Sequence, residues 1–259
     1  MSNKKDYEKK LDVIKAIGDD QIKIPNNIPL GVYIQEADNL YQWCQEDKDT
    51  LTGLGLSWEL VEDLPVRSGA LREAESLWNA ERFTRQEASE TWEEESAAAY
   101  DLRDELLQYF RFAFRNDPGL SEQVRRIARG RGHADMIQDL NNLCILGKQN
   151  PGLLANINFD MSLLDKAAEK ADQMAQLLAE ANTERAEYKE AKKIRNQAFT
   201  HLKEAVDEIY KYGRFAFRDN DERRKGYRSN YMYMRRKKAG RKVAEEESKP
   251  ANSPVPTPE

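Results

Sequence analysis

The sequence has a cluster of cationic and aromatic residues near its C-terminal end that could bind a ligand. Residues 211–242 hold 13 lysines and arginines against 3 acids, whereas the whole chain carries a net charge of −5. Tyr227, Tyr231 and Tyr233 stand among these cations. A basic helix that also carries aromatic rings can contact phosphates and stack on bases. The stretch is therefore either a site for nucleic acid or another polyanion, or a solvated helix that balances acidic stretches elsewhere.

A five-residue motif, Arg-Phe-Ala-Phe-Arg, occurs at 111–115 and again at 214–218. On a helix its two arginines are four residues apart and share one face, so with the aromatic rings they could bind phosphate or stack on bases. We favour a structural interpretation, in which the arginines complement the negative C-terminal end of a helix and the phenylalanines pack against short helices. The motif, with the tyrosine before each copy, comprises Tyr109, Arg111, Phe112, Phe114, Arg115, Tyr212, Arg214, Phe215, Phe217 and Arg218.

Two kinds of partner fit this C-terminal surface, a polyanion and a protein. Binding to phosphates must weaken steeply as ionic strength rises, whereas docking of an apolar helix need not. The candidate binding residues are Arg214, Arg218, Arg223, Arg224, Lys225, Tyr227, Arg228, Tyr231, Arg235 and Arg236.

Catalytic and metal chemistry have little support in the sequence. The two histidines are His133 and His201, and a helical metal site of the Glu-x-x-His type would need acids where Gly130 and Ala198 stand. The sequence has no glycine-rich phosphate loop, no Gly-x-Ser-x-Gly and no Cys/His nucleophile pattern. The two cysteines lack metal-ligand spacing and are typical of reduced, partly buried side chains. We therefore expect no catalytic residue, no metal, no cofactor and a non-enzymatic protein.

The helices that carry these residues belong to a sequence repeat. The repeated motif defines an offset of 103 residues, and many other positions match at the same offset without a gap. We infer a tandem duplication of a helical unit, with copies at about 32–128 and 135–231. The matches include Ile34/Ile137, Gln35/Gln138, Leu40/Leu143, Asp104/Asp207, Glu105/Glu208 and Tyr109/Tyr212.

Each copy contains one long segment without helix breakers. Residues 160–217 have no proline, and no glycine before Gly213, and their apolar residues recur mostly at spacings of three and four. In the first copy a helix should start near Ser57, Pro65 and Gly69 should interrupt it, and the breaker-free segment should follow from Ala70. The sequence thus predicts an all-α fold with long helices at about 70–115 and 160–217, each roughly 70 Å or more in length. A helix of this length needs a partner to cover its apolar seam, so we expect the two to pair antiparallel as an elongated, coiled-coil-like rod.

A duplicated antiparallel pair has a pseudo-two-fold axis, at which a residue meets its own equivalent. The middle of the first copy lies near Trp92, whose equivalent is Arg195, and we predict an aromatic–guanidinium contact between them. The alternative is that each long helix folds back near its middle into a four-helix bundle, with 182–183 as the weak hinge of the second copy.

Short helices are expected at the ends of the rod, and proline-rich segments flank it. Pro25 and Pro29 mark an extended connector before the first copy. The predicted organisation is an N-terminal helix and connector (1–31), repeat copy 1 (32–128), repeat copy 2 (135–231), a basic extension (232–244) and a disordered, proline-rich tail (245–259).

Composition and charge restrict the class of protein. Hydrophobic residues make up 39% of the chain and charged residues 34%, which suits long helix packing better than a thick globular core. No stretch approaches the length of a transmembrane helix and the first residues lack a signal-peptide core, so we expect a cytoplasmic location and no membrane insertion. The leading hypothesis is an adaptor or spacer with protein partners. The alternative is a protein that binds nucleic acid or another polyanion through the basic C-terminal helix, and the oligomeric state stays open.

Overall fold

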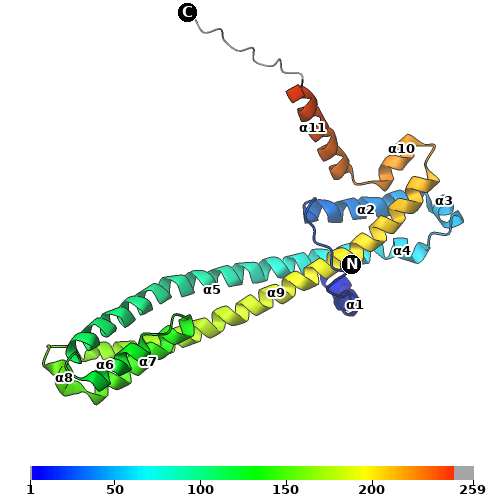
Figure 1. The fold of residues 1–259 in the computed structure, drawn as a ribbon. Helices are drawn as coiled ribbons and strands as arrows, with labels where there is room; N and C mark the ends of the chain where they lie inside the picture. The colour runs from blue at the N-terminus through cyan, green and yellow to red at the C-terminus, as the bar shows by residue number, and fades with distance from the viewer. Residues whose placement is uncertain (1, 248–259) are drawn as a thin grey trace, which may run out of the picture. The chain divides into compact units, whose positions relative to one another are not determined.

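The computed structural model describes residues 2–247, and all regular secondary structure in that range is helical, which confirms the predicted all-α class (Figure 1). None of the helices within this range is long and apolar enough to cross a membrane. The elements are α1 (Asn3–Lys15), α2 (Leu30–Glu46), α3 (Lys48–Gly53), α4 (Trp58–Glu62), α5 (Leu64–Ala113), α6 (Pro118–Ile127), α7 (His133–Gln149), α8 (Pro151–Ala155), α9 (Ser162–Ala216), α10 (Asp221–Arg224), the 3-10 helix η1 (Lys225–Tyr227) and α11 (Asn230–Glu247).

The two long helices form as predicted. Helix α5 has 50 residues and α9 has 55, so the fold-back alternative with a hinge at 182–183 is wrong. The predicted interruption at Pro65 and Gly69 is also wrong, because α5 begins at Leu64. A proline in the first turn of a helix lacks only a donor that would have no partner there. Gly69 stays helical and makes room for Asp6 of α1, which a Cβ at this position would overlap.

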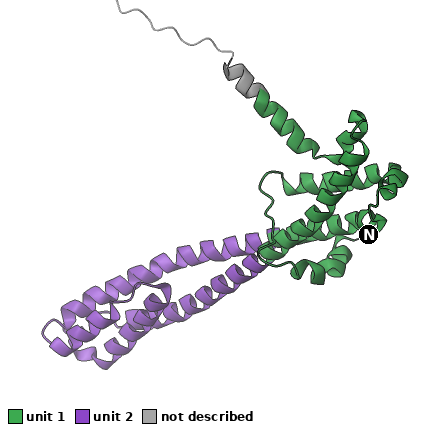
Figure 2. Cartoon of the chain, turned by 45° about the vertical axis from the view of Figure 1, so that its right-hand side comes forward, with its two compact units in different colours: residues 1–78, 191–259 green, residues 79–190 purple. Residues whose placement is uncertain are grey.

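The chain forms two compact units (Figure 2). Unit 1 comprises 1–78 and 191–259, and unit 2 comprises 79–190. Both long helices run through both units, so each unit combines parts of the two predicted repeat copies.

Unit 1 has its own hydrophobic core. It joins α1 and α2 to the first turns of α5 and the last turns of α9, with Leu40, Leu71 and Leu202 among its fully buried side chains. Gly213 of α9 is part of this packing, since a Cβ there would lie 2.0 Å from the ring of Tyr227. The missing side chain is what allows the tyrosine to enter the core.

Unit 2 has a separate core made by α6, α7, α8, the end of α5 and the start of α9. Phe110 and Leu143 are fully buried in it. The partly buried guanidinium of Arg103 donates to Asp139 at 2.7 Å and to the carbonyl oxygen of Gly130 at 3.4 Å. Burial raises the pKa of Asp139, and the hydrogen bonds from Arg103 oppose that rise.

The smaller elements differ from the sequence prediction at several places. Helices α3 and α8 were not predicted, and their glycine and proline residues lie at their ends, where short helices tolerate them. The basic helix α11 runs as far as Glu247. The predicted disordered tail therefore overlaps α11 at 245–247, and its remainder, 248–259, lies outside the described residues.

Candidate functional site

The predicted binding residues of the C-terminal segment lie in several different environments. Two of them pack against α2. The Arg223 side chain donates to both carboxylate oxygens of Asp47 at 2.8 Å and to Glu46 at 2.8 Å, and its guanidinium lies 4.5 Å from the ring centre of Trp43. The fully buried Tyr227 donates its hydroxyl to Asp47 at 2.5 Å. Burial and this hydrogen bond raise the pKa of Tyr227. These two residues hold α10 and η1 onto unit 1 and are not free to bind a ligand.

Two more of the predicted cations are paired with neighbouring acids. Arg224 lies 2.5 Å from Asp221, and Lys225 pairs with Glu222. Both pairs join residues three positions apart on the surface, where ion pairs contribute little to stability. They lower the local positive charge that the sequence suggested.

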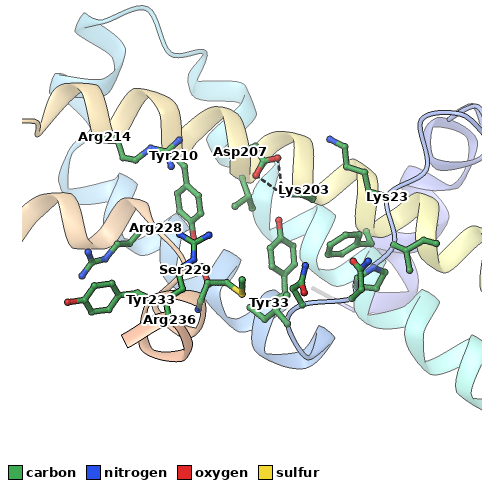
Figure 3. Close-up of a pocket in the computed structure, with 18 of the residues that line it drawn as sticks. Lys23, Tyr33, Lys203, Asp207, Tyr210, Arg214, Arg228, Ser229, Tyr233 and Arg236 are labelled. Atoms are coloured by element: carbon green, nitrogen blue, oxygen red, sulfur yellow. Dashed lines mark hydrogen bonds and ion pairs between the residues drawn. The ribbon is translucent and has the colours of Figure 1, made fainter. Parts of the chain in front are cut away.

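Three of the other predicted cations line a pocket of about 760 Å³ in unit 1 (Figure 3). Arg214 comes from the end of α9, Arg228 precedes α11, and Arg236 lies on α11. The opposite wall is the connector 22–28, which was not a predicted site element. The Arg235 side chain donates to the Asn27 carbonyl at 2.8 Å and so fixes α11 to the connector.

Further backbone contacts hold the walls of the pocket in place. The Lys23 backbone N–H donates to the Thr200 hydroxyl at 2.8 Å, which fixes the connector to α9. The Tyr231 backbone N–H donates to Glu36 at 2.8 Å, which fixes the start of α11 to α2. The predicted Tyr231 is thus held to α2 through its main chain and does not itself line the pocket.

Positive charge dominates the pocket. Five cationic side chains line it, and its one acid, Asp207, accepts from the Lys203 ammonium at 2.8 and 2.9 Å. The Tyr33 side chain lies between these charges and the apolar wall, with its ring 5.0 Å from that of Phe199. Its hydroxyl is buried and has no hydrogen-bond partner among the described residues. The cationic members are Lys23, Lys203, Arg214, Arg228 and Arg236.

The repeated motif is only partly structural. Phe114 is fully buried, and Phe217 stacks on Tyr227 with ring centroids 5.5 Å apart, which fits the packing interpretation. Phe112 and Phe215 do not fit it, because they are 56% and 58% exposed. The reason is helical geometry: residues two apart in a helix face in different directions.

Each exposed phenylalanine carries an arginine of the same motif over its ring. The guanidinium of Arg115 lies 4.2 Å from the Phe112 ring centre, and that of Arg218 lies 5.2 Å from the Phe215 ring centre. We call these two surfaces the Phe112 patch and the Phe215 patch.

The other motif residues sit beside the two patches. The Tyr109 ring meets Phe159 edge-on at 5.2 Å, and Tyr212 packs partly buried on the core of unit 1. Arg111 is exposed in the last turn of α5, where a cation complements the helix C-terminus.

Trp92 and Arg195, which were predicted to contact each other, contact other residues instead. The Arg195 guanidinium lies 4.2 Å from the ring centre of Trp78, and Trp92 meets His133 edge-on with ring centroids 4.9 Å apart. Each residue therefore makes an aromatic contact with a residue that the repeat did not predict. The repeat sets the spacing of the two copies, but it does not fix where along the helices the axis lies.

One group of acidic residues has metal-ligand spacing. Carboxylate oxygens of Glu81, Glu184 and Glu187 lie within 4.8 Å of one another in unit 2. No sequence pattern marks this group, because Glu81 lies about a hundred positions before Glu184 and Glu187. The residues are partly or fully exposed, as acidic groups on helix surfaces commonly are.

The pocket and its buried tyrosine were also missed by sequence reasoning. The connector and α11 are separated by about two hundred residues, and no pattern in either segment marks them as neighbours. The extended connector with two prolines was the available signal, since it cannot be absorbed into a helix. No family model, curated protein or solved structure matches the chain.

Proposed function

We propose that this protein is a non-enzymatic adaptor or spacer that binds protein partners through the Phe112 and Phe215 patches. The observation that supports this is the presence of the same exposed phenylalanine, with an arginine over its ring, in both units. An exposed aromatic ring contributes little hydrophobic free energy to folding. It contributes to binding when a partner covers it.

We infer a tandem duplication, and the element bounds support it. Helices α2 (Leu30–Glu46) and α7 (His133–Gln149) differ by the offset of 103 at both ends, and α5 and α9 end at Ala113 and Ala216. Equivalent hydrogen bonds recur: Gln35 to Asn39 at 3.1 Å corresponds to Gln138 to Asn142 at 3.0 Å. The N-caps of α6 and α10 are also equivalent, with Asp117 accepting from Leu120 and Asn220 from Arg223, both at 3.0 Å.

We also propose that the long helices pair antiparallel, with the axis at Arg85 and not at Trp92. In unit 2 the Arg85 guanidinium lies 4.9 Å from the ring centre of Tyr188, its own equivalent at the offset of 103. In unit 1 Trp78 contacts Arg195. The second pair lies seven residues back on α5 and seven residues forward on α9, as one antiparallel register requires.

The surroundings of Phe112 favour a protein as partner. The ring borders a hollow of about 450 Å³ on α5, lined also by Glu105, Gln108 and Tyr109. An apolar anchor with both a cation and an acid nearby suits a partner segment that offers an aliphatic side chain and polar neighbours. Arg115 over the ring adds a site for a partner carboxylate.

The test is quantitative affinity capture with the full chain and with Phe112→Ser, Phe215→Ser and the double variant. Phe83→Ser is the matched control, because Phe83 is 66% exposed and lies on α5 outside both patches. We expect the double variant to lose most of the captured partner while its melting temperature stays unchanged, and the control to retain the partner. Equal recovery by the double variant would contradict the proposal.

The alternative function is binding of nucleic acid or another polyanion through α11, where Arg236, Lys237 and Lys238 are exposed. The test is fluorescence anisotropy of short RNA and DNA across a salt series. The comparison variant reverses these three charges, since truncation before α10 would remove Tyr227 from the core. Tight, salt-sensitive binding that the variant loses favours this alternative. No binding at low salt removes it.

A further inference from the structure

The pocket between the connector and α11 has the features of a ligand site that the adaptor function does not use. Its volume of about 760 Å³ falls in the range of sites for small molecules. Its walls come from four segments: the connector, α2, α9 and α11. Side-chain and main-chain hydrogen bonds fix the connector to α9 and to α11, so the site is formed without a ligand.

Charge and apolar surface are separated along the pocket. Figure 3 shows Arg214, Arg228 and Arg236 gathered at one end and Lys23 at the other, with Tyr33 between them. Apolar side chains complete the lining: Ile22, Ile24, Phe199, Val206 and Met232. Neither Arg214 nor Arg236 forms an ion pair with any of the residues that the structure describes. An unpaired arginine group next to apolar surface is complementary to an anion that carries a hydrocarbon chain.

The Tyr33 hydroxyl is the second indication of a ligand. The residue is 8% exposed, and its hydroxyl lines the pocket without a hydrogen-bond partner in the described part of the chain. Burial raises its pKa, so the group is a neutral donor. A buried hydroxyl without a partner costs free energy that a ligand oxygen would recover.

The duplication explains why unit 1 has this space, and this step alone rests on the proposed repeat. In unit 2 the segment 125–131 leads continuously from α6 to α7. At the offset of 103 it corresponds both to the connector 22–28 and to 228–234, which are separate segments on opposite walls of the pocket. The partly buried Arg103 corresponds to the shorter Val206, which lines the pocket.

We propose that this pocket binds a single-chain amphiphile with a phosphate head and a polar linker, the chemistry of a lysophosphatidate. The phosphate lies on Arg214, Arg228 and Arg236, a linker oxygen accepts from Tyr33, and the alkyl chain covers the apolar lining.

The first experiment is isothermal titration of the full chain with monomeric lauroyl lysophosphatidate. We expect saturable one-to-one binding, and at least tenfold weaker binding by Arg214→Glu and Arg236→Glu. The matched control is Lys238→Glu, which makes the same charge change on α11 outside the pocket and should bind within about twofold of the wild type. All three positions are exposed on α9 and α11, and melting curves verify that the variants fold.

Tyr33→Phe tests the linker contact by itself. It should weaken lauroyl lysophosphatidate by about tenfold and leave dodecyl phosphate, which has no linker oxygen, unchanged. Dodecyltrimethylammonium and inorganic phosphate should not bind.

Several results would overturn the proposal: no saturable binding, equal binding by the arginine variants, or equal binding of the cationic amphiphile. Binding to phosphatidate vesicles without binding of the monomer would also overturn it and would indicate a membrane-surface contact. Displacement by an acidic amphipathic peptide, with no binding of the amphiphile, would identify the pocket as a protein groove. Loss of partner capture in the Phe112 and Phe215 variants is independent of each of these results.

Discussion

His201 is a buried, uncharged histidine in unit 1. Burial, with Arg67 and Lys10 nearby, lowers its pKa from 6.5 to about 4, and Asp63 only partly opposes this. His201 therefore becomes protonated near pH 6.5 in the unfolded chain, but only near pH 4 in the folded chain. Stability from this residue is present above pH 6.5 and is lost as the pH falls toward 4.

The predicted loss from His201 between pH 7 and pH 5 is about 2 kcal/mol in the free energy of unfolding. Urea unfolding at both pH values checks it, with His201→Gln as the comparison, since glutamine has no proton to gain. The variant should lose less stability than the wild type over this range. Parallel pH dependence in the two proteins would contradict the assignment.

Gly213 is required by the ring of Tyr227. A Cβ at this position would lie 2.0 Å from a ring atom, so Gly213→Ala must displace a fully buried side chain. We predict a loss of about 3 kcal/mol in the free energy of unfolding, measured by urea denaturation. Gly152→Ala in α8 is the control, because nothing lies within 4 Å of its Cβ position. A loss no larger than that of the control would show that the core relaxes around the new methyl group.

For single residues, the sequence marked candidates by their type but did not reveal which of them the fold uses for its own packing. It marked Arg223 and Tyr227 as binding residues because they stand among cations and aromatics, but both are held by Asp47. Charge pairing across 176 positions leaves no local pattern. Tyr33 was missed because the residues of α9 and α11 that line its pocket are far from it in the sequence.

At the scale of elements, Arg223 and Tyr227 together hold α10 and η1 against the C-terminal end of α2. Arg223→Ala leaves the buried Asp47 with the Tyr227 hydroxyl as its remaining side-chain donor, and we predict a loss of about 2 kcal/mol in the free energy of unfolding. Arg224→Ala should cost less than about 0.5 kcal/mol, because its partner Asp221 is exposed. Thermal and urea unfolding of both variants check this, and equal losses would contradict the structural role of Arg223.

The long helices were predictable, whereas the shortest helices, α3 and α8, were not. Breaker-free segments with regular apolar spacing predicted α5 and α9 to within a few residues, apart from the start of α5 at Pro65. Helices α3 and α8 have six and five residues, too few for periodicity to be detected. Their existence depends on packing against α2 and α7, which the sequence does not reveal.

At the scale of the whole molecule, each unit has a hydrophobic core of its own, and equivalent residues test this. Leu40 and Leu143 are fully or almost fully buried, one in each core, and stand at the offset of 103. Replacement of a buried leucine by alanine costs about 3 kcal/mol. Leu143→Ala should therefore speed amide hydrogen exchange in α6, α7 and α8 and leave α2, α3 and α4 unchanged, and Leu40→Ala should do the reverse.

The short helices are the informative reporters in this experiment, because α5 and α9 belong to both units and can transmit fraying from one core to the other. Exchange measured by mass spectrometry under native conditions resolves each short helix separately. If either variant accelerates exchange equally in all six short helices, the two cores unfold as one cooperative body. If acceleration stays within the unit of the substitution, the long helices connect two domains that open separately, as a spacer with a binding surface in each unit requires.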